Sequence, residues 1–70
     1  MFDYSKLEGR IVEKFGSRRA FAEAWGKSEN TISRKLNGKI AFSTTDIIEV
    51  SGAEMLDIHP AEYHEYFFAV

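Results

Sequence analysis

The sequence has no cysteine, a single proline and no long hydrophobic run. Without cysteine there is neither a disulfide framework nor a thiolate zinc site, and the composition fits a reducing cytosol. No apolar run approaches the length of a membrane span, and the N-terminal residues lack the apolar region of a signal peptide. We therefore expect a soluble cytoplasmic protein with no membrane partner.

The groupings that carry catalysis are also missing from the sequence. Its serine and threonine residues have no paired histidine and acid arrangement, and no glycine-rich phosphate loop occurs. His59 and His64 cannot form a metal site by themselves, so we expect them and their acidic neighbours to be solvated surface. The sequence predicts no enzyme activity, no cofactor, no metal and no small-molecule substrate.

What the 70 residues do contain is enough apolar material for one small core. Of these residues 44% are hydrophobic and 14% aromatic, which argues against disorder. No repeat, low-complexity tract or linker divides the chain, so we expect a single domain over residues 1–70. At this size, stability without disulfides or metals requires well-packed helices or a partner.

Short apolar repeats between capping residues predict helices and no strand. Leu7, Ile11 and Phe15 recur every four residues after a capping box that begins at Ser5, and Gly16 ends this first helix. The later helices are expected to begin at three serines and at the one proline, which are Ser17, Ser28, Ser43 and Pro60.

The last two predicted helices differ in regularity. The fourth carries a less even apolar set, and Gly52 within it costs about 1 kcal/mol relative to alanine. Its apolar residues are Ile47, Ile48, Val50, Met55 and Leu56. The fifth carries Tyr63, Tyr66 and Phe67. The fold class predicted from these segments is an all-α, compact five-helix bundle.

Charge is divided unevenly along the chain. Residues 1–39 hold all nine lysines and arginines against five acids, a net charge of +4. Residues 40–70 hold six acids and no lysine or arginine, a net charge of −6. The overall charge of −2 therefore conceals a basic half, and a local basic patch sets the field for nucleic acid more than the total does.

The basic half contains a predicted helix-turn-helix unit at residues 17–38. Ala22 is small where two helices would cross, and Gly26 suits a turn that needs positive φ. Ile32, six residues later, would return the second helix to the core.

The second helix of this unit has polar residues where a helix in the major groove reaches bases. Those near its N-terminus read base edges first; asparagine can pair with adenine and arginine with guanine. A helix N-terminus also accepts a phosphate, and lysine and arginine around it would add backbone contacts, here Arg18, Lys27, Lys35 and Lys39.

The run from Ser17 to Gly38 resembles the Cro/C1-type helix-turn-helix of phage repressors, and KLNG at 35–38 resembles the end of the recognition helix in lambda-type repressors. Small phage-encoded Cro-like proteins are similar over nearly the whole chain, at FDYSKLEGRI, EKFGS, KLNGK and EYFF. The resemblance implies a lambda-repressor-like DNA-binding domain that binds operator DNA, usually as a dimer on a near-palindromic site.

The resemblance also implies roles for single residues. Glu29, Asn30 and Arg34 fall on base-reading positions and Asn37 on a backbone-contact position, although the family often has glutamine at the position of Glu29 and an apolar residue at that of Lys27. The predicted recognition helix spans 29–36, and the predicted DNA-binding residues are Arg18, Lys27, Ser28, Glu29, Asn30, Thr31, Ser33, Arg34, Asn37 and Lys39.

The leading prediction is thus a sequence-specific transcriptional regulator, a Cro-like phage repressor. The acidic half and a pI near 5.6 favour an alternative, an anti-repressor type of modulator that docks on another repressor through its acidic C-terminal half. An antitoxin ranks lower, because the aromatic ending is typical of a folded segment rather than a disordered toxin-binding tail.

The tail itself leaves two roles open. Tyr63 and Phe67 are expected to close the core against the first helix. Phe68 and Val70, if exposed, would form an apolar patch suited to association, such as a dimer contact.

Overall fold

The computed structural model describes residues 2–70, and within them the chain is helical, with no strand. In chain order the elements are α1 (Ser5–Phe15), α2 (Arg18–Trp25), α3 (Glu29–Leu36), α4 (Thr44–Val50), the 3-10 helix η1 (Pro60–Glu62) and α5 (Tyr63–Phe67). The prediction of an all-α, five-helix protein is confirmed. No helix among these residues is long and apolar enough to cross a bilayer.

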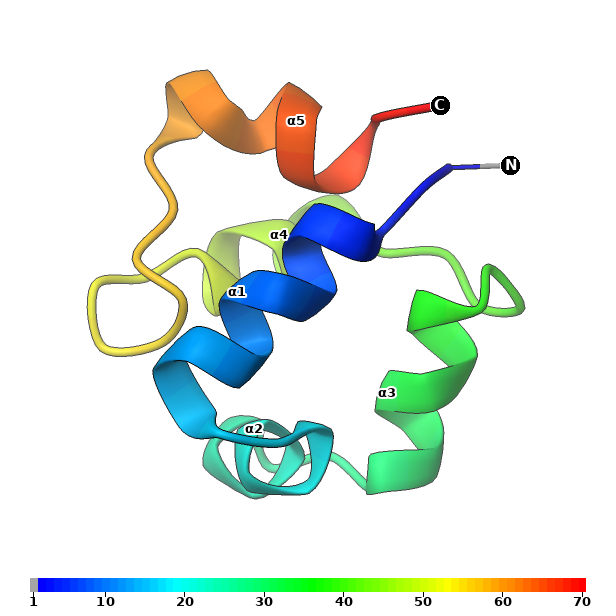
Figure 1. The fold of residues 1–70 in the computed structure, drawn as a ribbon, viewed down its shortest axis with the longest axis vertical. Helices are drawn as coiled ribbons and strands as arrows, with labels where there is room; N and C mark the ends of the chain where they lie inside the picture. Colours follow the sequence, from blue (N-terminus) through cyan, green and yellow to red (C-terminus); the bar gives the residue numbers. More distant parts are fainter. Residues whose placement is uncertain (1) are drawn as a thin grey trace.

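The other helices are arranged around α1, which runs through the middle of the molecule (Figure 1). α1 contacts α2 near one of its ends and α5 near the other, and α2 in turn contacts α3. The segments 2–4 and 68–70 lie close together at one corner, beside the start of α1 (Figure 1). There the backbone N–H of Asp3 donates to the carbonyl of Ala69 at 2.6 Å.

One hydrophobic core joins these helices. Phe21 and Phe67 are among its largest fully buried side chains, one from α2 and one from α5. The expectation that Phe67 closes the core is confirmed, and Tyr63 packs against the core while remaining partly exposed. The buried members of the core are Tyr4, Leu7, Ile11, Phe21, Ala22, Ile32, Leu36, Ile47, Val50, Leu56, Ile58, Tyr66 and Phe67.

Three predicted helix starts are confirmed by their caps. The side chains of Ser17, Ser28 and Ser43 each accept a hydrogen bond from a backbone N–H in the first turn that follows. At Ser43 the capping box is complete, because the Asp46 carboxylate accepts the Ser43 N–H at 3.0 Å. Such caps satisfy N–H groups that the helix itself leaves unpaired.

The predicted capping box at Ser5 is wrong. Ser5 is the first residue of α1, and both its N–H and its hydroxyl donate to a carboxylate oxygen of Asp3, at 2.9 and 2.6 Å. Glu8, which would have completed the box, instead forms an ion pair with Arg18 of α2. Arg18, from another helix, therefore binds the Glu8 carboxylate that the local sequence pattern assigned to the cap.

The predicted fourth helix is too long. α4 ends at Val50, and Met55 and Leu56 lie in a turn stabilised by a bond from the Leu56 N–H to the Val50 carbonyl, 2.9 Å. Arg10 of α1 holds this turn, because its guanidinium donates to the carbonyls of Leu56 and Asp57, each at 2.8 Å. This turn leaves Leu56 completely buried.

Candidate functional site

The helix-turn-helix region presents a polar face to solvent. Gly26, at φ +79°, ends α2 in the left-handed region, and this turn lets α3 start three residues later, at Glu29, at an angle to α2. Four of the predicted contact residues on or beside α3 are exposed, Glu29, Asn30, Arg34 and Asn37, and Lys39 is exposed just beyond them. The structure therefore brings this part of the predicted site together on one surface.

Other predicted contact residues bond to side chains or backbone groups of the same chain. Arg18 pairs with Glu8 of α1 and reaches the hydroxyl of Ser33 on α3 at 3.3 Å. The Ser28 hydroxyl caps α3 by accepting the Thr31 N–H at 3.1 Å and lies 2.9 Å from the Thr31 hydroxyl. Arg18 thus joins α2 to α1 and α3, and Ser28 and Thr31 stabilise the start of α3, so these side chains are partly occupied by the fold itself.

Lys27 is exposed in the turn between α2 and α3, but its ammonium does not simply extend into water. It lies over the Trp25 ring, 5.3 Å from the ring centroid. The indole N–H of Trp25 donates to Glu49 of α4 at 2.9 Å. Cation–π contact at such an exposed position contributes about 0.5–1 kcal/mol. Lys27 therefore covers an aromatic ring as well as adding charge.

The expectation that Lys35 would touch a DNA backbone is wrong. Its side chain is 9% exposed, and its ammonium lies 2.8 Å from an Asp46 carboxylate oxygen and 3.2 Å from the Ala41 carbonyl. It also lies 5.5 Å from the centroid of the Phe42 ring. Helical spacing predicted an exposed position for Lys35, but the segment that connects α3 to α4 folds over its side chain.

Asp46 is the counterpart of this buried lysine. Burial by itself would raise the pKa of its carboxyl group, but hydrogen bonds from Lys35 and Ser43 and the charge of Lys35 outweigh that effect and hold the pKa below its ordinary value. The ionised Asp46 carboxylate thus connects the start of α4 to Lys35 of α3.

These internal contacts reduce the positive charge that a DNA partner could use. Arg18 and Lys35, both predicted to contact phosphates, are neutralised by acids of the same chain. Lys27, Arg34 and Lys39 remain around α3, where Glu29 offsets one of them. Because affinity for DNA depends on the number of phosphates that cations neutralise, this surface is a weak electrostatic match to a duplex.

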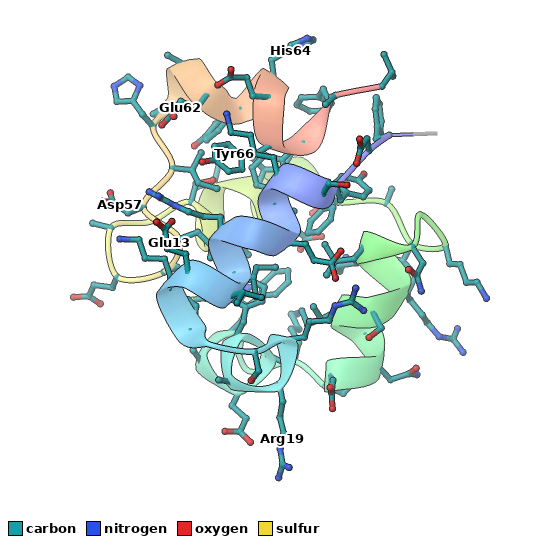
Figure 2. The ribbon with its side chains drawn as sticks, viewed as in Figure 1. Glu13, Arg19, Asp57, Glu62, His64 and Tyr66 are labelled. Carbon is teal, nitrogen blue, oxygen red and sulfur yellow. The ribbon has the colours of Figure 1, made fainter. Side chains whose placement is uncertain are left out.

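The acidic half is also partly consumed by internal contacts. Asp46 pairs with Lys35, Glu49 accepts the Trp25 N–H, Glu65 pairs with Lys6 at 3.3 Å, and Glu62 accepts the His59 N–H at 3.4 Å. The remaining carboxylates belong to Glu54 and Asp57, which are exposed in the turn after α4. Figure 2 shows Asp57 and Glu62 with Glu13 on the side of the molecule away from α3.

The two histidines play different parts. His59 starts η1, because its Nδ1 accepts the Ala61 N–H at 3.1 Å. His64 is exposed on α5 (Figure 2). Neither belongs to a group of three or more metal-ligating side chains within residues 2–70.

An exposed apolar surface, only part of which was predicted from the sequence, lies where the two chain ends meet. Phe2 is 44% exposed, Phe68 41% and Val70 97%, and we call these three residues the terminal patch. The rings of Phe2 and Phe68 meet edge to face with centroids 5.7 Å apart. The prediction that Phe68 and Val70 would form an apolar patch, if exposed, did not include Phe2. No local pattern shows that residue 2 meets residue 68.

Comparison with known proteins places the chain in a family. A family model described as a protein of unknown function, DUF739, matches residues 1–70, and the chain belongs to that family. No curated protein matches it with significance.

The chain is also similar to a solved structure, the modulator of repression (MOR) of the temperate bacteriophage TP901-1 from Lactococcus lactis. The two are 40% identical, with a TM-score of 0.83 over 96% of this chain and 88% of that one.

These findings correct the leading prediction. The resemblance to Cro/C1-type repressors identified the wrong family, and the predictions of a DNA-binding repressor and of operator DNA as the partner were wrong. The similar protein is a modulator of repression, which agrees with the alternative of a protein-binding modulator. Which of the predicted residues contact a partner stays a prediction, since no comparison tests single residues.

Proposed function

We propose that this chain binds a repressor protein and weakens the hold of that repressor on its operator. The observation that carries the proposal is the 40% identity to a phage modulator of repression over 96% of the chain, with the same helical fold.

Two features of the molecule agree with a protein partner. Its net charge of −2 and its acidic C-terminal half complement the positive surface by which a repressor binds DNA. The internal ion pairs of Arg18 and Lys35 remove cations that direct DNA binding would need. We take residues 1–70 as one binding unit, with the helix-turn-helix at 17–38 as part of it, acting in the cytoplasm where the repressor meets its operator.

The proposal is tested with a fluorescently labelled operator and the purified repressor from the genome that encodes this chain. The repressor raises the anisotropy of the operator, and adding the chain should return it to the value of free DNA. The chain alone should leave the anisotropy unchanged at about 0.15 M salt, where weak phosphate contacts are screened. A repressor that stays on the operator at saturating amounts of the chain contradicts the proposal. An unrelated repressor on its own operator is the control, and the chain should not displace it.

A further inference from the structure

The terminal patch differs from the other exposed apolar side chains of the described residues. Val12 lies on α1, Ile40 on the link after α3 and Ile48 on α4, and single exposed residues of this kind are ordinary. Phe2 and Phe68, by contrast, are in ring contact across the two ends of the chain. Adjoining exposed aromatic rings are typical of an interaction site.

The patch is also held in place before any partner arrives. The Asp3 N–H bonds to the Ala69 carbonyl between its two halves. The Phe2 ring meets the ring of buried Tyr4 edge to face at 6.4 Å, which connects the patch to the core. A preformed aromatic surface loses little conformational entropy on binding, and aromatic anchors of this kind dominate the energy of many protein interfaces.

The charges around the patch favour a basic partner protein over a second copy of this chain. The residues beside it, 2–4 and 65–70, hold two carboxylates, those of Asp3 and Glu65, and no lysine or arginine. Lys6 offsets one of them through its pair with Glu65. Hydrogen bonds from the Ser5 side chain and backbone lower the pKa of Asp3, so its exposed carboxylate stays ionised. Two copies of the chain joined through this patch would bring like charges together, whereas a basic protein surface would complement them.

The small area of the patch also favours a partner protein of opposite charge. A stable pair of proteins buries about 800 Å² from each partner, just under a fifth of the 4344 Å² that this molecule exposes. Three side chains, two of them more than half buried, fall well short of that area. The interface must therefore include the acidic residues around them, which favours a partner of opposite charge.

We infer that the terminal patch is the surface on which the DNA-binding domain of the repressor docks, with Phe2 and Phe68 entering an apolar recess amid its lysines and arginines. This inference rests on the proposed function and names the surface that performs it. Asp3 then meets a cation that the repressor otherwise uses for phosphates, so docking and operator binding exclude each other.

The test compares three variants by isothermal titration calorimetry against the purified repressor of the same genome. Phe68→Ser and Val70→Ser change the patch at exposed atoms. Ile48→Ser is the matched control, since Ile48 is 60% exposed on α4, away from the chain ends. We expect Phe68→Ser to weaken binding at least tenfold, as loss of an aromatic anchor does, Val70→Ser to weaken it about threefold, and Ile48→Ser to stay within twofold of wild type. Thermal unfolding of each variant confirms that it is folded.

Three results would overturn the inference. If the wild type binds the repressor and Phe68→Ser binds equally well, the surface is wrong while the proposed function stands. If the wild type sediments as a dimer and Phe68→Ser as a monomer with unchanged repressor binding, the patch joins two copies of this chain. If the wild type does not bind the repressor at all, the proposed function fails and this inference fails with it.

Discussion

At the scale of single residues, the same side chain can serve the fold or a partner, and sequence position does not decide which. Lys35 lies one residue after Arg34 in the same helix, yet Arg34 is exposed and Lys35 is buried against Asp46. The Lys35–Asp46 pair is the clearest case of a predicted contact residue that stabilises the protein instead.

Replacing Asp46 with asparagine should therefore be costly. Asp46→Asn keeps an oxygen for the Ser43 N–H but leaves the buried Lys35 ammonium without a counter-charge. Removing one partner of a buried pair costs roughly 3 kcal/mol in the free energy of unfolding. Urea unfolding at neutral pH measures this value. Glu23→Gln, which breaks the exposed pair of Glu23 with Arg19, is the control and should change the value by less than about 0.5 kcal/mol.

The difference between wild type and Asp46→Asn should also depend on pH. The pKa of Asp46 is lower in the folded chain than the ordinary value of 3.8, so its contribution to stability is complete above that value. It is lost as the pH falls through the lower pKa of the folded state. A difference that stays constant down to pH 2 would contradict the role given to this carboxylate.

At the scale of helices and turns, the sequence predicts local features well and distant ones poorly. The caps at Ser17, Ser28 and Ser43 depend on residues three positions away, and all three predictions were confirmed. The end of α4 depends on Arg10, which is 46 residues from Leu56 along the chain. No pattern within α4 could show that contact, so the predicted helix continued too far.

The turn after α4 should depend measurably on Arg10. Arg10→Ala removes two hydrogen bonds from a charged donor to the carbonyls of Leu56 and Asp57 and should cost about 2 kcal/mol in the free energy of unfolding. Hydrogen exchange at the Ile58 amide, which bonds to the Ser51 carbonyl, should quicken as the turn loosens. Lys14→Ala removes the same charge one turn further along α1 and should change neither quantity. Equal effects of the two substitutions would show that the positive charge matters, rather than the hydrogen bonds from Arg10 to the turn.

At the scale of the whole molecule, the fold class could be predicted from the sequence but the function could not. The helix arrangement that suggested a repressor is present, and the exposed face of α3 agrees with that suggestion as far as geometry goes. Function could not be predicted from that arrangement because a fold does not fix its partner. The partner depends on where charge remains free after internal pairing and on the surface that forms where the two chain ends meet. Both depend on tertiary contacts, such as the pair of Arg18 with Glu8 and the ring contact of Phe2 with Phe68.

The most direct test of a protein partner is a pair of calorimetric titrations under one set of conditions. The chain is titrated into the purified repressor and, separately, into the operator duplex, at about 0.15 M salt. We predict saturable heat with the repressor, with a Kd of about 1 μM or tighter, and none with the operator. Saturable binding to the operator together with no binding to the repressor would contradict this account.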